Sequence, residues 1–184
     1  MNCEHEEVDM GKLVESTFMA LNGFITAPQE WSPPYWDDEH SAYAAKLLFD
    51  ADALLLGRRT YDGFVQAWPL RSGDPYADRI NAMPKYVASR TLQETTWNTT
   101  ILEGDAAEEV ARLKEEQNLL KFGTGELDRT LLAGGLVDEL HVWVFPVLAA
   151  GGDSLIDGID TTHLKLVATT PFASGIVVNT YAPA

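Results

Sequence analysis

The chain has 184 residues, 46% of them hydrophobic, and a formal net charge of −15. This length is enough for one well-buried core, so we expect a single domain over residues 11–184 after a flexible acidic tail, residues 1–10. The negative charge argues against nucleic acid and anionic membrane surfaces as partners, since both need clustered Lys and Arg, and no apolar run is long enough to span a bilayer. Cys3, the single cysteine, lies in the tail. This excludes an internal disulfide and, with the polar N-terminus, predicts a cytoplasmic protein.

The first half of the chain alternates predicted strands and helices. Residues 12–21 are β-rich and predict a strand, closed by the turn pair Asn22-Gly23. We expect a loop over 28–34, and then a helix that opens on Asp37, Asp38 and Glu39 and runs to about Phe49. The unbroken apolar run 53–56 predicts a strand buried on both faces. Thr60, a good N-cap, predicts a helix to about Gln66, followed by a loop over 68–75.

The second half begins in the same way and ends in strands alone. Strands are predicted over 85–88, 99–102, 119–122 and 139–147. Helices are predicted after the cap Asp105 and over 126–133, where Gly134-Gly135 provides a stop. Residues 164–170 and 175–181 are predicted to pair as a terminal hairpin. This order indicates an α/β protein with a mainly parallel sheet flanked by helices and an antiparallel C-terminal addition.

Three predicted strands end in residues suited to bind phosphate: Gly57-Arg58-Arg59-Thr60, Ser89-Arg90-Thr91 and Gly123-Thr124-Gly125. Glycine permits close backbone approach, arginine offers a bidentate fork, and a hydroxyl adds a hydrogen bond. In a parallel sheet these ends lie on one edge, where a dinucleotide with a pyrophosphate and an extra ribose phosphate would meet all three. The alternative is structural, with glycines forming tight turns and arginines paired with some of the many acids. Neither a G-x-G-x-x-G nor a P-loop signature is present.

Five segments carry a resemblance to a known family: Thr17–Phe24, Leu54–Tyr61, Met83–Leu92, Gly123–Leu127, and Gly135–Leu140 followed by Phe145–Val147. They resemble the dihydrofolate-reductase-like superfamily, and within it the stand-alone form of the riboflavin-biosynthesis reductase domain, the RibD C-terminal family. The resemblance implies a three-layer α/β/α fold with a mostly parallel sheet and an antiparallel C-terminal hairpin. It also implies a homodimer and NADPH as the hydride donor.

The resemblance further implies roles for the three strand ends. The family segment at the cofactor's phosphates matches Gly57, Arg58, Arg59 and Thr60. The family pair that binds the adenosine ribose phosphate matches Ser89 and Arg90. The family turn under the pyrophosphate matches Gly123, Thr124, Gly125 and Leu127. The chain departs from the family pattern at two points. Asn22 replaces the usual Asp of its turn, and Asp153-Ser154 stands where a basic pair is common, which disfavours binding of a phosphorylated substrate through that loop.

The residues that would contact a substrate are less marked. Asp38 is a candidate proton donor, although an acid at a helix start is more often a cap. Asn22 and Trp31 are candidate substrate contacts; Trp31 belongs to a group of loop aromatics that could cover a flat heterocycle or pack on the first helix. No His, Asp or Glu spacing suggests a metal site. His141, within a predicted strand, is expected to be packed.

We therefore predict an NADPH-dependent reductase of a small heterocyclic substrate of the pyrimidine or pterin type. Two alternatives stay open at this point. One is a non-catalytic dimeric nucleotide-binding protein that retains the NADPH cleft, and the other is a reductase that uses NADH. In the second case Arg58, Arg59 and Arg90 would have no ribose phosphate to bind.

Overall fold

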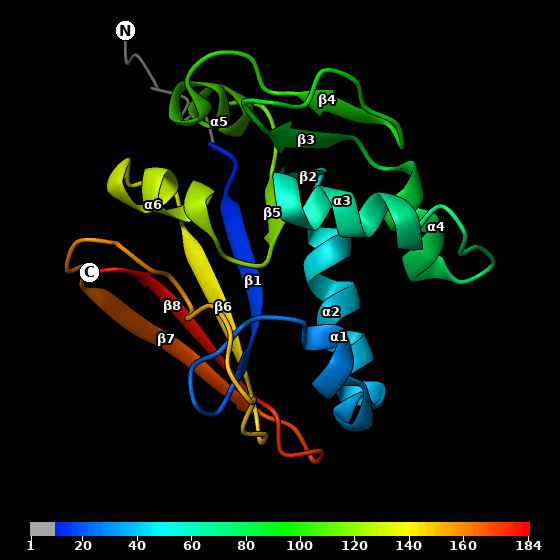
Figure 1. Ribbon diagram of the computed structural model, residues 1–184, viewed down its shortest axis with the longest axis vertical. Helices are drawn as coiled ribbons and strands as arrows, with labels where there is room; N and C mark the ends of the chain where they lie inside the picture. The colour runs from blue at the N-terminus through cyan, green and yellow to red at the C-terminus, as the bar shows by residue number, and fades with distance from the viewer. Residues whose placement is uncertain (1–9) are drawn as a thin grey trace, which may run out of the picture.

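The computed structural model describes residues 10–184 (Figure 1), so the predicted tail, apart from Met10, lies outside the described residues. The strands are β1 (Leu13–Ala20), β2 (Ala53–Gly57), β3 (Lys85–Ala88), β4 (Thr99–Ile101), β5 (Leu119–Phe122), β6 (Glu139–Phe145), β7 (Leu164–Pro171) and β8 (Val177–Pro183). The helices are α1 (Pro28–Trp31), the 3₁₀ helix η1 (Pro33–Tyr35), α2 (Asp38–Asp50), α3 (Arg58–Ala67), α4 (Pro75–Ala82), α5 (Ala106–Lys114) and α6 (Glu126–Ala133).

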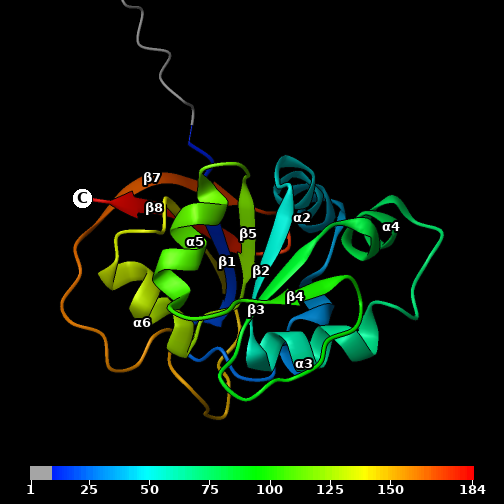
Figure 2. The ribbon, with the colours of Figure 1, turned by 90° about the horizontal axis from the view of Figure 1, so that it is seen from above.

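All of the described strands join one sheet in the order β4-β3-β2-β5-β1-β6-β8-β7. The pairs from β4 to β6 are parallel, whereas β8 and β7 are antiparallel additions. Figure 2 shows α5 and α6 on one side of the sheet and α2, α3 and α4 on the other. The predicted three-layer α/β/α fold with an antiparallel C-terminal hairpin is confirmed.

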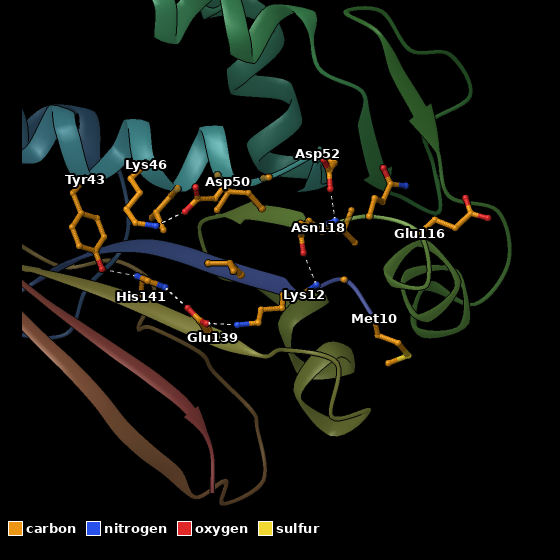
Figure 3. Close-up of a pocket in the computed structure, with 17 residues that line it drawn as sticks. Met10, Lys12, Tyr43, Lys46, Asp50, Asp52, Glu116, Asn118, Glu139 and His141 are labelled. Atoms are coloured by element: carbon orange, nitrogen blue, oxygen red, sulfur yellow. Dashed lines mark hydrogen bonds and ion pairs between the residues drawn. The ribbon is translucent and has the colours of Figure 1, made fainter. Parts of the chain in front are cut away.

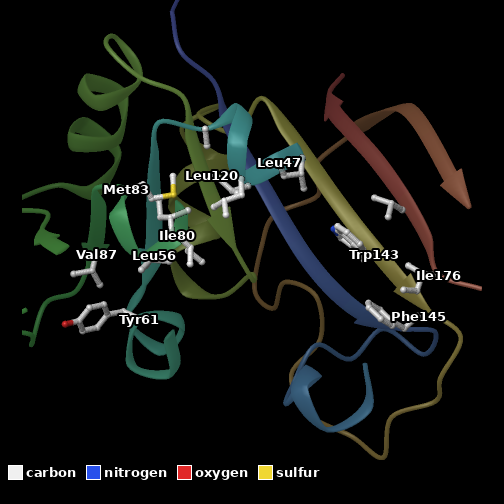
Figure 4. Close-up of a cluster of buried hydrophobic side chains, with 14 of the residues drawn as sticks. Leu47, Leu56, Tyr61, Ile80, Met83, Val87, Leu120, Trp143, Phe145 and Ile176 are labelled. Carbon is white, nitrogen blue, oxygen red and sulfur yellow. The ribbon is translucent and has the colours of Figure 1, made fainter. Parts of the chain in front are cut away.

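The apolar run of β2 supplies both layers of the core. Successive side chains of a strand point to opposite faces of the sheet. Leu54 and Leu56 therefore belong to the buried cluster on the α2 side, which also contains Ile80 and Leu120 (Figure 4), whereas Leu55 packs on the α5 and α6 side. The three leucines are fully buried, and each contributes about 1.5–3 kcal/mol of burial free energy. β2 is thus the centre of the fold, and its last residue opens the first of the three turns.

Two local predictions are corrected by the structure. Thr60 is not the N-cap of α3; the chain turns from β2 directly into the helix, so Gly57 is the cap and Thr60 lies in the first turn. The loop predicted over 68–75 ends in a helix that was not predicted. Asp74 caps α4 by accepting a hydrogen bond from the Ala77 N–H at 2.9 Å, and Pro75 is its first residue.

Smaller differences concern the ends of other elements. The predicted loop over 28–34 contains α1 and most of η1. The strand predicted to reach Val147 ends at Phe145, because Pro146 has no N–H to continue the ladder. The last strand begins at Val177 rather than Gly175, since Gly175 adopts φ 93° in the hairpin turn. Asp105 caps α5 and Gly134 ends α6, as predicted.

Candidate functional site

The three predicted turns lie next to one another at the carboxyl edge of the sheet. β3, β2 and β5 are neighbouring parallel strands, and the register pairs Gly57 with Ala88 at the ends of β2 and β3. The Thr60 hydroxyl donates a hydrogen bond to the Phe122 carbonyl at 3.3 Å, which links the β2 and β5 turns. Gly123 has φ 70°, a conformation that favours glycine. The sheet therefore gathers residues that are more than sixty positions apart in the sequence.

Two helices begin at this edge and point the start of their backbones toward it. α3 starts directly after Gly57, and no side chain caps its first N–H groups. α6 starts directly after Gly125, and the Gly125 N–H donates to Asp128 Oδ2 at 2.6 Å. Uncapped N–H groups at a helix start, together with the helix dipole, favour a bound anion. Of the two helix starts, that of α3 has more N–H groups available to an anion, because no side chain caps it.

Each of the three arginines at these turns is paired with an acid. Arg58 Nε lies 2.9 Å from both Asp62 carboxylate oxygens, and its Nη1 donates to Thr91 Oγ1 at 3.3 Å. In the other two pairs the nitrogen–oxygen distance is 2.5 Å for Arg59 with Asp153 and 3.0 Å for Arg90 with Glu126, and the arginine side chains are 89% and 87% exposed. Exposed pairs of this kind contribute about 0–1 kcal/mol each, so a phosphate can replace the carboxylate.

Hydroxyls and apolar side chains of the turns have local partners. Ser89 Oγ accepts hydrogen bonds from the N–H groups of Thr91 at 3.3 Å and Leu92 at 3.1 Å, which shapes the β3 turn. The Thr124 hydroxyl donates to the Leu155 carbonyl, and Leu127 is half-buried and packs, like Leu155, against the core below α6. These contacts hold the shape of the turns.

A buried ion pair that the sequence reasoning missed lies directly under the β5 turn. Lys121 Nζ is 2.7 and 2.9 Å from the two Asp128 carboxylate oxygens and donates to the Gly123 carbonyl at 2.6 Å. The side chains of Lys121 and Asp128 are 2% and 0% exposed. Asp128 also accepts a hydrogen bond from the Gly125 N–H, so the ion pair holds both glycines of the turn. The sequence signal for this pair was a lysine inside the apolar strand Leu119–Phe122.

Glu15 lies beside this pair, because β1 and β5 place it in register with Lys121. The Glu15 carboxyl is fully buried, and neither of its oxygens has a hydrogen-bond partner. Burial raises the pKa of Glu15 well above its ordinary value; the charge of Lys121 opposes this, and that of Asp128 adds to it. A neutral Glu15 leaves Lys121 and Asp128 as a balanced pair.

The candidate substrate contacts lie beyond β5, near the ends of β1 and β6. The Asn22 side chain bonds the backbone of Ala149 twice, donating at 2.9 Å and accepting at 3.1 Å. Trp31 donates from Nε1 to the Thr26 carbonyl at 3.0 Å and packs edge-on against Phe145. Asp38 is exposed in the first turn of α2. Asn22 and Trp31 therefore already serve as supports of this end of the sheet.

The N-terminal cap of α2 is Asp37. Its carboxylate accepts a hydrogen bond from the His40 N–H at 2.8 Å. Asp37 thus occupies the capping position that was the alternative explanation for the acids at this helix start. The Asp38 carboxylate is left without that role.

A cavity of about 570 Å³ lies at the opposite, amino edge of the sheet (Figure 3). Tyr43 Oη is 2.8 Å from His141 Nδ1, His141 Nε2 is 3.2 Å from Glu139, and Lys12 reaches the same carboxylate at 3.1 Å. Burial lowers the pKa of His141, and Glu139 partly opposes the shift. His141 is packed, as predicted, and the cavity contains none of the predicted site residues.

Among the described residues 10–184, no helix is long and apolar enough to cross a membrane. Within the same range, no group of three or more His, Cys, Asp or Glu side chains is placed to hold a metal ion.

The fold defines a three-layer α/β protein whose basic and glycine-rich turns gather at one edge of the sheet. Comparison of the sequence with known families makes the assignment specific. The chain belongs to the RibD C-terminal domain family, which matches residues 12–178. The uncharacterized protein YyaP of Bacillus subtilis (strain 168) is 32% identical over 142 residues, 73% of this chain and 75% of that protein.

Solved structures share the fold at lower identity. A putative riboflavin biosynthesis protein from Shewanella sp. PV-4 has a TM-score of 0.76 at 20% identity, with 94% of this chain and 99% of that chain covered. Dihydrofolate reductase from Enterococcus faecalis, complexed with NADP(H), has a TM-score of 0.60 at 17% identity, with 95% and 97% covered. A Thermotoga maritima deaminase and 5-amino-6-(5-phosphoribosylamino)uracil reductase has a TM-score of 0.65 at 13% identity. The match covers 95% of this chain and 57% of that chain. At these identities the likeness concerns the fold.

Proposed function

We propose that the protein is an NADPH-dependent reductase of a small heterocyclic substrate of the pyrimidine or pterin type. The observation that carries this proposal is the gathering of three exposed guanidinium groups and two glycine turns at adjoining strand ends. Family membership supports it, as does the fold shared with reductases, one of which is complexed with NADP(H).

The residues at the carboxyl edge fit a phosphorylated dinucleotide by charge and by backbone shape. Gly57, Arg58, Arg59 and Thr60 would hold its phosphates, Ser89 and Arg90 its adenosine ribose phosphate, and Gly123, Thr124, Gly125 and Leu127 its pyrophosphate. The uncapped N–H groups of α3 add donors in the same place. Arginine suits this task because its fork binds phosphate oxygens in pairs.

The bound cofactor would supply the hydride, and the chain's own residues would orient the substrate and deliver a proton. We place the substrate near the ends of β1 and β6, with Asn22 and Trp31 at its border. Asp38, exposed at the start of α2, is the candidate proton donor, directly or through water. The lone cysteine and the use of a nicotinamide reductant together favour a cytoplasmic localisation of the protein.

A titration followed by a turnover assay tests this proposal. Tryptophan fluorescence is measured against NADPH and NADH at two salt concentrations, and NADPH consumption is then followed with dihydropterins and aminouracils. We expect NADPH to bind more tightly than NADH and more weakly at high salt. NADPH binding without turnover of any compound would favour the non-catalytic alternative. Equal affinity for the two nucleotides would favour a reductase that uses NADH. If neither nucleotide binds, both the reductase and the non-catalytic nucleotide-binding protein are refuted.

We also propose that two copies of the chain pair through the edge of the sheet. β7 is an edge strand with exposed apolar side chains, including Leu166 at 54% and Val167 at 57% exposure. Exposed strand edges with apolar side chains readily pair with a second chain. Light scattering should therefore give a dimer mass for the native chain and a monomer mass for Val167→Lys. A native monomer would contradict this.

A further inference from the structure

The loops after β1 and β6 form one connected surface beside the proposed cofactor turns. The Leu21 N–H donates to the Val147 carbonyl at 2.9 Å, and the Ile25 N–H donates to the Asp153 carbonyl at 3.0 Å. The Asp153 N–H in turn donates to Thr26 Oγ1 at 2.7 Å. We call residues 21–27 and 147–155 the paired loops. Because both the N–H and the carbonyl of Asp153 are bonded, its backbone is held in place.

The ion pair between Arg59 and Asp153 borders the proposed substrate site. Arg59 lies in the first turn of α3 after β2, and Asp153 follows β6. In the sheet, β5 and β1 separate those two strands, a span of roughly 14 Å at the usual strand spacing. The pair therefore closes over the ends of β5 and β1. A substrate near the ends of β1 and β6, as proposed above, would lie beside this pair.

Arg59 is the one cation that reaches the paired loops. Among the hydrogen bonds and ion pairs of residues 10–184, no other lysine or arginine side chain contacts either loop. Arg58 pairs with Asp62 on its own helix, and Arg90 pairs with Glu126 on the β3 side of the edge. Among these contacts the paired loops thus meet a single guanidinium, and an acid already occupies it; the Arg129 guanidinium of α6 lies against Gly158, beyond the loops.

On the paired loops of the described residues, this arrangement offers no free cation to a substrate phosphate in either state of Arg59. If Arg59 stays with Asp153, the charges of the pair cancel. If it turns to the phosphates of the dinucleotide, the Asp153 carboxylate is left unpaired and repels a second phosphate. Lysine and arginine side chains favour phosphate binding, and a nearby carboxylate opposes it.

We propose that the substrate carries no phosphate group and that Asp153 is the residue that enforces this selection. The inference rests on the proposed reductase function and narrows its substrate to an unphosphorylated heterocycle. Amino or ring N–H groups of such a compound can donate to the Asp153 carboxylate. The Thermotoga maritima protein with this fold is, by contrast, a reductase of a phosphoribosyl compound.

Calorimetric titration with a matched pair of compounds tests the proposal. The pair is 5-amino-6-(5-phosphoribosylamino)uracil and its dephosphorylated form, titrated into the chain with and without saturating NADP⁺. We expect the dephosphorylated compound to bind at least about fivefold more tightly, because partly screened like charges disfavour the phosphate. Asp153→Asn should shift the ratio of the two affinities toward the phosphorylated compound. Asp160→Asn removes an exposed acid of the same connection and should leave the ratio unchanged.

The outcomes separate this proposal from the proposed function. Failure of NADP⁺ itself to bind would refute the cofactor assignment, whereas the ratio measured without NADP⁺ still reports on Asp153. Tighter or equal binding of the phosphorylated compound by the native chain would overturn the selection. An unchanged ratio in Asp153→Asn would overturn the role of Asp153. Binding of neither compound, in a chain that binds NADP⁺, would overturn the substrate class.

Discussion

The surface of the carboxyl edge and the layer buried beneath it hold their cations in opposite ways. Arg59 and Arg90 on the surface are 89% and 87% exposed, whereas Lys121 under the β5 turn is 2% exposed and its partner Asp128 is fully buried. An exposed pair can exchange one anion for another at little cost, but a buried pair cannot lose a partner without a large penalty. The surface is therefore suited to exchange its partners, and the buried layer keeps the turn in shape.

The largest expected effect comes from breaking the buried pair. Lys121→Met leaves the Asp128 carboxylate buried without its cation, and we expect a loss of about 3–5 kcal/mol in the free energy of unfolding. Urea unfolding measures it. The double variant Lys121→Met with Asp128→Leu should recover much of the loss, because no charge then remains uncompensated.

An exposed pair provides the control for this comparison. Lys46 and Asp50 are paired one helical turn apart and are 71% and 61% exposed. Lys46→Met should change the unfolding free energy by less than about 0.5 kcal/mol. Equal losses in Lys46→Met and Lys121→Met would contradict the distinction between the two regions.

The pH dependence of stability tests the protonation of Glu15. Its raised pKa means that, above the ordinary value of 4.5, the folded chain holds a proton that the unfolded chain releases. The free energy of unfolding should therefore fall as pH rises from 4.5 toward the raised pKa. Glu15→Gln stays neutral at every pH, so its curve should meet that of the native chain at acid pH and lie above it near neutrality. A native chain more stable than Glu15→Gln at neutral pH would show that Glu15 is ionised beside Lys121.

The smallest expected effect concerns the acid that pairs with Arg90. Glu126→Gln removes the carboxylate that competes with the ribose phosphate, so NADPH affinity should rise roughly two- to threefold. NADH affinity should stay the same. Glu116→Gln removes the same charge from the amino edge and should leave both affinities unchanged. A fall in NADPH affinity in Glu126→Gln would mean that Glu126 supports Arg90 instead of competing for it.

Much of the fold follows from local sequence signals. The apolar run of β2, the cap Asp105 and the Gly134-Gly135 stop each predict their element, because each acts within a few residues. The helix α4 was missed although Asp74-Pro75 is a good start signal. Thr60 was misplaced as a cap, since the sequence does not show that the chain turns into α3 without an intervening residue.

The candidate site is less accessible to sequence reasoning, because its contacts join distant segments. That arginines would pair with acids could be anticipated, but Asp153 as the partner of Arg59 depends on how the paired loops meet. Lys121 in an apolar strand is visible, yet its pairing with Asp128 arises only when α6 folds back over β5. The roles of Asn22 and Trp31 as loop supports likewise need the three-dimensional contacts.

Comparison of NADPH and NADH affinity in the native chain and in Arg90→Ala tests the central claim most directly. The account predicts that the native chain prefers NADPH by at least about tenfold and that Arg90→Ala loses most of this preference while binding NADH as before. Arg112→Ala removes an exposed arginine of α5 and should keep the preference. Equal affinity of the native chain for both nucleotides, or an unchanged preference in Arg90→Ala, would contradict it.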